Sequence, residues 1–295
     1  MGTLGTAFRD IIEQVMPIAK SPSLITEKNV FQEGDNNILP FIDKMVETLI
    51  LPGSGLEGFG NLEELYSKAE AGKSCLLLLE HYSNMDLSLF SYLVRKAGGR
   101  GGEIGNSIIA IAGMKLSEEN PMVSALASAY SRIIIYPSRS LKGLEGERKK
   151  TELLRSSAIN RAALKALNDV KTRGRLILVF PSGTRYRSWD PSSKRGVREI
   201  DSYIKSFDYM CMVSINGIVL HVHESDMKDD TISKDLVYIT ISPVLSCEKF
   251  RENIITASGG FSDAADRKQA VADAIMAELE KMHIEGEKRR NLQKK

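Results

Sequence analysis

Short apolar segments alternate with longer segments of helical periodicity beyond about residue 58, and this alternation most constrains the fold. The segments expected to form strands are 75–79, 107–112, 132–136, 176–180, 212–218 and 236–241. Helical spacing of apolar residues marks 87–96, 121–129, 148–172 and 263–283. The strand segments are apolar at nearly every position, as is typical of strands buried on both sides. The pattern predicts an α/β fold with a central mixed, largely parallel sheet covered by helices on both faces.

The first part of the chain has a different pattern. Apolar residues repeat at helical spacing around 8–16 and 38–49, and four prolines, Pro17, Pro22, Pro40 and Pro52, punctuate this part of the chain. The glycine-rich stretch 53–60 predicts a flexible joint. We therefore expect a small N-terminal helical segment, 1–58, and an α/β domain, 59–295. The last residues, 287–295, are basic and are expected to be frayed.

Composition excludes several classes of protein. The chain has 295 residues, of which 42% are hydrophobic, so it can bury a sizeable core. A net charge of +2 does not suit a nucleic-acid-binding protein. Three widely spaced cysteines lack metal-binding spacing and indicate a reducing compartment, the cytoplasm or an organelle stroma. No window approaches the ~18 apolar residues that cross a bilayer, so any membrane contact is expected to be peripheral.

A histidine and an aspartate five positions apart follow the strand predicted at 75–79. His81 and Asp86 can meet only if His81 lies in the turn before the next helix and Asp86 in its first turn. Ser83 and Asn84 are good N-cap candidates, which favours this layout. A carboxylate that holds one imidazole nitrogen leaves the other nitrogen able to accept a proton from a hydroxyl. Alone, the pair is more typical of a helix cap without any chemistry.

Cationic side chains follow two other predicted strands. Gly183 allows a tight turn after the strand at 176–180, and Thr184 then leads to Arg185 and Arg187. Arg139, with Ser140 beside it, follows the strand at 132–136. Arginine binds phosphate oxygens through two parallel hydrogen bonds, so the arginines are candidates for a phosphate site. Ligands commonly bind at the carboxyl ends of parallel strands, where these groups are predicted to gather with His81.

These blocks together resemble the glycerolipid acyltransferase superfamily, and most closely the soluble plastid-type glycerol-3-phosphate acyltransferases. The resemblance spans about 75–225 and rests on four ordered blocks: 81–86, 111–115, 133–140 and 181–187. Most members of the superfamily carry glutamate where Ser182 stands, whereas the plastid-type branch is similar in having Pro-Ser-Gly and two arginines one residue apart. That branch carries a Lys-His pair where Arg139 and Ser140 stand, which is a departure.

The resemblance implies a reaction and a set of roles. His81 is the general base on the sn-1 hydroxyl of glycerol 3-phosphate, and Asp86 orients it. Arg185 and Arg187, with Arg139 and Ser140, hold the phosphate, while Ser83, Asn84, Gly183 and Thr184 support the loops. The acyl donor is a thioester of acyl-carrier protein or of coenzyme A, and no metal or bound cofactor is implied. The product is lysophosphatidic acid.

Three alternatives remain at this point. The first is a 1-acylglycerol-3-phosphate acyltransferase, which adds the second chain to the same backbone. The second is a metal-dependent hydrolase that uses His221 and His223, with Glu224 and Asp226 nearby. The third is a non-catalytic module that binds membrane or carrier protein through the basic tail and a cluster of cations, Lys142, Arg148, Lys149 and Lys150.

Overall fold

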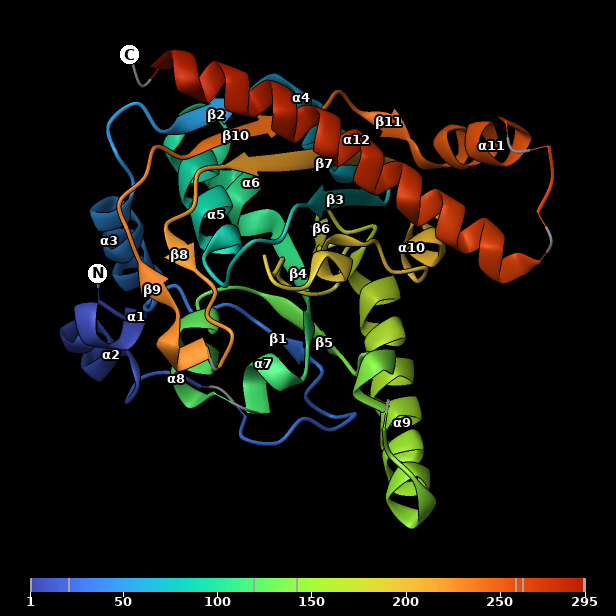
Figure 1. The fold of residues 1–295 in the computed structure, drawn as a ribbon, viewed down its shortest axis with the longest axis horizontal. Coiled ribbons are helices and arrows are strands. Elements are labelled where there is room, and N and C mark those ends of the chain that lie inside the picture. The colour runs from blue at the N-terminus through green and yellow to red at the C-terminus, as the bar shows by residue number, and fades with distance from the viewer. Residues whose placement is uncertain are drawn as a thin grey trace.

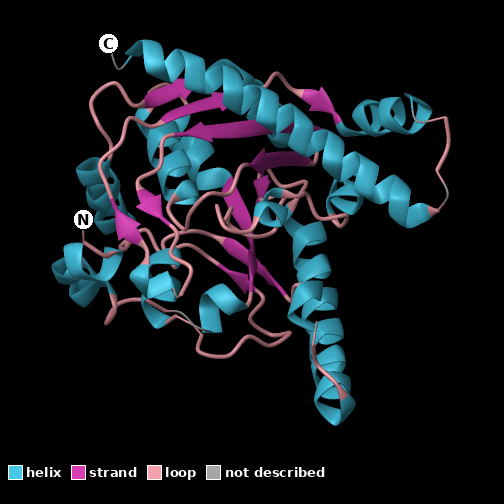
Figure 2. Ribbon diagram, viewed as in Figure 1, coloured by secondary structure: helices cyan, strands magenta, loops and turns pink. Residues whose placement is uncertain are grey.

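A computed structural model describes residues 2–20, 22–118, 120–141, 143–225, 227–257, 259–261 and 263–293. Within these residues the chain forms a nine-stranded mixed sheet with helices on both faces, as predicted (Figures 1 and 2).

Five parallel strands form the centre of the sheet, in the spatial order β5-β4-β6-β3-β7. Their bounds are β3 (Cys75–Leu79), β4 (Ile108–Gly113), β5 (Arg132–Ile135), β6 (Leu176–Val179) and β7 (Tyr209–Asn216). Each lies on a segment that was predicted to be a strand. The largest shift is at β7, which begins at Tyr209 rather than at 212. Shifts of this size are usual for element ends.

The edges of the sheet are made partly by the N-terminal segment. Its two strands were not expected from the helical pattern of this region: β1 pairs antiparallel with β5, and β2 pairs parallel with β10. Strands β10 and β11 both pair antiparallel with β7. Strands β8 and β9 form a separate pair. The bounds are β1 (Phe31–Gln32), β2 (Gly55–Glu57), β8 (Leu220–His221), β9 (Thr231–Ile232), β10 (Tyr238–Ile241) and β11 (Leu245–Ser246).

Alternation along the strands divides the core into two layers. On β3, Leu77 faces one layer and Leu76 the other, and both are fully buried. The Leu77 layer packs against α1 (Leu4–Ala7), α2 (Arg9–Val15), α3 (Leu39–Leu49), α4 (Phe59–Glu70), α5 (Asp86–Lys96), α6 (Gly101–Ser107) and α8 (Pro121–Ala127). The Leu76 layer packs against α9 (Gly146–Val170), α10 (Ile200–Ser206), α11 (Cys247–Ala257) and α12 (Ala264–Gln293). Short turns at α7 (Lys115–Glu118), η1 (Ser138–Leu141), η2 (Pro191–Lys194) and η3 (Met227–Asp229) complete the chain.

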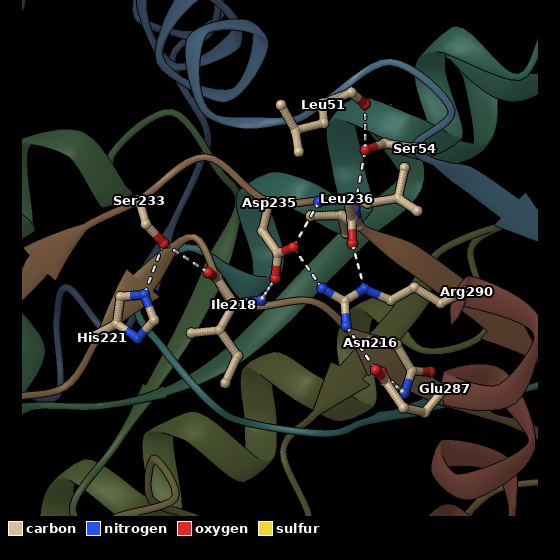
Figure 3. A network of polar contacts seen from close by, with 11 residues as sticks. Leu51, Ser54, Asn216, Ile218, His221, Ser233, Asp235, Leu236, Glu287 and Arg290 are labelled. Atoms are coloured by element: carbon tan, nitrogen blue, oxygen red, sulfur yellow. Dashed lines mark hydrogen bonds and ion pairs between the residues drawn. The ribbon is translucent and has the colours of Figure 1, made fainter. Parts of the chain in front are cut away.

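The expectation of a frayed C-terminal tail is wrong for residues 287–293. Helix α12 continues to Gln293 and crosses the sheet beside β7 (Figure 1). Arg290 is buried: its Nη2 lies 2.5 Å from Asp235 Oδ1, and its Nε donates to the carbonyl of Leu236 at 2.7 Å (Figure 3). Gly286 lets the helix approach β7, because a Cβ there would lie 2.2 Å from Asn216 Oδ1. The basic composition of the tail gave no indication that Arg290 would be buried against Asp235 and Leu236.

Helix α9 extends away from the body of the protein (Figure 1). Its first turn carries Arg148, Lys149 and Lys150, all exposed, and Lys150 pairs with Glu147. Lys142, which belongs to the same predicted cluster, lies outside the described residues, as do Lys294 and Lys295 of the tail. The three described cations therefore lie on a solvated helix surface.

Candidate active site

The segment from His81 to Asp86 joins the end of β3 to the start of α5. His81 lies in the turn and Asp86 is the first helical residue, as predicted. The cap differs from expectation: Met85 is the N-cap residue, and its side chain makes no capping bond. Ser83 acts on the turn itself, because its Oγ accepts a hydrogen bond from Met85 N at 3.1 Å. Asn84 Nδ2 instead contacts Met227 Sδ at 3.4 Å.

The Asp86 carboxylate is buried and surrounded by donors. Its Oδ2 lies 2.9 Å from His81 Nδ1 and accepts the backbone N–H groups of Tyr82 and Ser83, at 2.6 and 2.8 Å. Its Oδ1 accepts the Ser83 hydroxyl at 2.9 Å. The carboxylate is 2% exposed, so its charge is compensated by these donors and by the N-terminus of α5 rather than by water. The arrangement keeps a fixed acceptor beside the imidazole.

The His81 ring is fixed on its other side by aromatic packing. It stacks on Phe180 with ring centroids 3.9 Å apart and planes 22° apart. The carbonyl of His81 accepts a hydrogen bond from Tyr186 N at 2.8 Å, which joins this turn to the arginine-containing loop. Among the described residues none hydrogen-bonds to His81 Nε2. Because Nδ1 faces a carboxylate, we assign the proton to Nδ1, which leaves the Nε2 lone pair able to accept one.

The loop after β6 turns sharply at Gly183. Its φ of +61° is left-handed, and its N–H donates to the carbonyl of Phe180 at 2.8 Å. Ser182 is buried and donates its hydroxyl to the carbonyl of Thr184 at 2.7 Å. Ser182 and Thr184 thus stabilise the turn that precedes Arg185 and Arg187.

Arg185 is already paired within the protein. Its Nη1 lies 2.5 Å from Oδ2 of Asp230, which is 1% exposed. The other oxygen of Asp230 accepts the N–H of His223 at 2.9 Å. Sequence analysis did not find Asp230, because it is 45 residues away from Arg185 and belongs to no motif. Arg185 therefore joins the loop to the segment between β8 and β9.

Arg187 and Arg139 lie together at the same loop. The Arg139 Nη2 approaches the turn so closely that a Cβ on Gly183 would lie 3.0 Å from it. Burial, together with the positive charge of Arg187, lowers the pKa of Arg139, and Glu199 offsets this only in part. Within the described residues neither guanidinium forms an ion pair with a carboxylate. Ser140 lies next to them, with a buried Oγ that has no hydrogen-bond partner in the described part of the chain. Two neighbouring cations that form no direct ion pair among the described residues suit an anionic ligand.

The two histidines of the hydrolase alternative bond to different serines. His221 Nε2 lies 2.7 Å from Ser233 Oγ (Figure 3), and His223 Nδ1 lies 2.8 Å from Ser225 Oγ. In the described ranges no group of three or more His, Cys, Asp or Glu side chains is placed to hold a metal ion. Asp226, which the alternative also names, lies outside those ranges. The structure therefore provides no support for the proposed metal ligands.

Two further features bear on the sequence-based expectations. Cys75, Cys211 and Cys247 are unpaired and buried, and burial raises the pKa of the Cys75 and Cys247 thiols to about 12. No helix among the described residues combines the length and apolar character needed to span a bilayer.

A comparison against known families matches the part of the chain that contains the site. The model of the family described as Acyltransferase matches residues 60–228, which is more than half of the chain and includes His81, Asp86, Arg139 and Arg187. The chain belongs to the acyltransferase family. The earlier resemblance is thereby confirmed at the level of the family, and the plastid-type branch stays a prediction.

Among solved structures, the chain is similar to the 1-acyl-sn-glycerophosphate (LPA) acyltransferase PlsC from Thermotoga maritima. The two chains share 17% sequence identity over 83% of this chain and 79% of that chain, with a TM-score of 0.44. A search of the curated proteins finds no match.

Proposed function

We propose that this acyltransferase moves a fatty acyl group from a thioester to a glycerol hydroxyl, with His81 as the general base. The observation that carries the proposal is the contact of 2.9 Å between His81 Nδ1 and the buried carboxylate of Asp86. It leaves Nε2 as the basic nitrogen, and Phe180 fixes the plane of the ring. An imidazole fixed in place with an unprotonated Nε2 is what general-base catalysis on a hydroxyl requires.

The chemistry balances without a covalent enzyme intermediate. His81 Nε2 takes the proton of the acceptor hydroxyl as its oxygen forms a bond to the thioester carbonyl carbon. The carbon–sulfur bond then breaks, and the same proton passes from Nε2 to the departing thiolate. Asp86 stabilises the transient imidazolium without taking its proton, as a carboxylate does for histidine in serine proteases. No bound cofactor takes part in the steps proposed.

The acceptor in this proposal carries a phosphate. Arg139 and Arg187 supply two neighbouring guanidinium groups that form no ion pair with a described carboxylate, and Ser140 can add a hydroxyl donor. Arg185 supports the same loop through Asp230. The phosphate would thus be held on the loop whose Tyr186 backbone bonds to His81, which couples acceptor binding to the base.

We propose glycerol 3-phosphate, acylated at its sn-1 hydroxyl, as the acceptor, and a thioester of acyl-carrier protein or coenzyme A as the donor. The Pro-Ser-Gly turn at 181–183 followed by two arginines supports this acceptor, since the plastid-type branch has a similar pattern. The monoacylated form, 1-acylglycerol 3-phosphate, carries the same phosphate and is the alternative acceptor. Either reaction is a step in phospholipid synthesis.

The test is thiol release from palmitoyl-CoA and from palmitoyl-acyl-carrier protein, each with glycerol 3-phosphate and with its 1-acyl form. One acceptor should give turnover with the wild-type protein, and His81→Ala should remove it while circular dichroism and melting temperature stay near wild type. His221→Ala is the matched control, because His221 is exposed and its side chain bonds only to Ser233 among the described residues. Near-normal turnover by His81→Ala would refute the proposed role.

A further inference from the structure

A second histidine–carboxylate pair lies directly behind the first. His283, on α12, places Nδ1 3.0 Å from Glu80 Oε2 and 3.2 Å from the Tyr82 hydroxyl. Tyr82 in turn donates its hydroxyl to Glu80 Oε1 at 3.1 Å. Glu80 and Tyr82 are the residues on either side of His81. One imidazole from the C-terminal helix therefore contacts both sequence neighbours of the proposed base.

These contacts are buried and tied to the sheet. Glu80 is 4% exposed, and its Oε2 also accepts the N–H of Ile215 on β7 at 2.9 Å. Burial of His283 disfavours its charged form, but the hydrogen bond and charge of Glu80 outweigh it, and the pKa of His283 is raised above its ordinary value. Burial, followed by the charge of Glu80, raises the pKa of Tyr82, so its phenol stays a neutral donor. The contact with Glu80 therefore favours the protonated form of His283, which places a positive charge beside this carboxylate.

The same residues reach the catalytic carboxylate through the backbone. The N–H of Tyr82 donates to Asp86 Oδ2, the oxygen that faces His81 Nδ1. The Tyr82 ring also meets Tyr186 edge to face, with centroids 6.0 Å apart. A displacement of Tyr82 would therefore disturb both the orientation of Asp86 and the loop that carries Arg187. Sequence analysis missed His283 because it lies 202 positions from His81 in a helix that the pattern marks only as a covering layer.

We infer that His283 is a positioning residue for the acyl transfer, which holds the turn of His81 through Glu80 and Tyr82 and balances the charge of Glu80. The inference rests on the proposed role of His81 as general base. It assigns to α12 a part in the reaction beyond covering the sheet.

The pairing of His283 with Glu80 predicts a specific change in the pH dependence of the reaction when His283 is replaced. Replacing His283 by glutamine keeps a donor for Glu80 and removes the positive charge. An uncompensated carboxylate next to His81 then favours the protonated imidazolium, which cannot act as a base. The acid limb of the pH profile of kcat/KM should therefore move to higher pH. Loss of one positive charge at the residue next to His81 should shift it by about half to one pH unit. A residue with only a structural role would lower the rate and leave the limb in place.

Other charged groups face His283, and they must be held constant. Glu280 lies on the same helix, and Lys194 approaches from η2 and pairs with Glu280. Asp86 acts on Tyr82 rather than on His283 itself, because its charge helps to raise the pKa of the Tyr82 phenol after burial and Glu80. None of these groups is altered by the substitution at 283, so a shift of the limb reports on Glu80.

The experiment is the pH profile of kcat/KM for wild type, His283→Gln and the double variant Glu80→Gln/His283→Gln, with the thioester and acceptor that the wild type uses. The single variant should show a lower kcat and a limb displaced to higher pH, and the double variant should return the limb to its wild-type position. If the acid limb of the His283→Gln profile coincides with that of wild type, the inference is overturned, even when the variant is slower. Glu285→Gln is the matched control, because Glu285 is an exposed residue of the same helix paired with Lys288.

Tyr82→Phe tests positioning separately, because it removes one hydroxyl and no charge. It should lower kcat and leave KM and the acid limb of the pH profile unchanged. A wild-type kcat for Tyr82→Phe would count against a positioning role, even if His283→Gln did not fold. Failure of this inference is distinguishable from failure of the proposed function. If His81→Ala retains activity, the base is misassigned; if His81→Ala is inactive and the limb does not move, only the role of His283 is lost.

Discussion

Each of the two loops at the site carries two kinds of charged or titratable group. One group forms an ion pair with a distant part of the protein, and the other keeps a polar end without such a partner among the described residues. On the first loop, Glu80 is paired with His283, whereas His81 Nε2 has no partner among the described residues. On the second, Arg185 is paired with Asp230, whereas Arg187 is placed beside Arg139. We call the first kind closed pairs and the second kind open groups.

Closed pairs and open groups differ in the part of the chain that supports the side chain. A closed pair joins its loop to a distant segment: α12 for Glu80, and the stretch between β8 and β9 for Arg185. An open group is supported by its own loop and keeps its reactive or charged end unsatisfied, which costs free energy unless a ligand binds there. Closed pairs should thus govern stability and alignment, and open groups should govern turnover and acceptor binding. Substitutions can test this division.

The largest effect is expected at Asp86, which supports the open nitrogen of His81. Asp86→Asn should lower kcat by about 10³–10⁴-fold, because an amide cannot fix the tautomer or stabilise the imidazolium. Steady-state kinetics at saturating acceptor measures this loss. Ser83→Ala, which removes only the hydroxyl bond to Asp86 Oδ1, should lose far less. Comparable losses in both variants would show that the turn, rather than the carboxylate, limits the rate.

The next largest effect is expected from breaking a closed pair. Arg185→Ala leaves Asp230 buried without a cation and should destabilise the fold by about 3–5 kcal/mol. Urea unfolding followed by circular dichroism measures the change. Arg185→Met combined with Asp230→Asn should recover part of it, because no unpaired charge remains. A wild-type unfolding midpoint for Arg185→Ala would move Arg185 to the open class.

Arg187→Ala should give the converse result on the same loop. The apparent KM for the phosphorylated acceptor should rise about 10- to 100-fold, as expected for the loss of hydrogen bonds to a charged group of about 1.5–3 kcal/mol, with little change in unfolding midpoint. Acceptor titrations at fixed donor concentration measure it. Arg161→Ala, at an exposed position on α9, serves as the control. An unchanged KM would remove Arg187 from the phosphate site.

The smallest effect is a pH dependence of stability. Because the folded pKa of His283 is raised, its pairing with Glu80 contributes fully below the unfolded pKa and is lost as pH rises through the folded value. The difference in free energy of unfolding between wild type and His283→Gln should therefore be largest below the ordinary histidine pKa of about 6.5 and shrink as pH rises through the raised folded pKa. Denaturant melts across these pH values measure it. A difference that grows with pH would have the wrong sign for a protonated closed pair.

Much of the fold follows from the sequence, because buried strands and amphipathic helices carry strong periodic signals. The run 75–79 is apolar at every position and forms β3 with the expected bounds. The short edge strands β1 and β2 were missed, since two or three residues cannot show a period. The helical tail was missed because a buried arginine such as Arg290 looks like a surface residue until its partners in a distant loop are known.

The open groups were accessible from sequence and the closed pairs were not. His81 lies five positions from Asp86, and Arg187 follows the turn after β6, so local spacing places both open groups. Asp230 and His283 meet their partners only through the packing of the sheet and α12. Local patterns therefore pointed to the residues proposed to face a ligand, but not to those that hold them in place, and they could not show that Arg185 is paired with Asp230.

The most direct test of the account is acyl transfer by wild type and His81→Ala with three acceptors: glycerol 3-phosphate, its 1-acyl form, and glycerol. Thiol release and product mass are measured together at saturating palmitoyl-CoA. The account predicts turnover with a phosphorylated acceptor, little with glycerol, and loss of turnover in His81→Ala with an unchanged fold. Equal turnover with glycerol, or a His81→Ala variant as active as wild type, would contradict it.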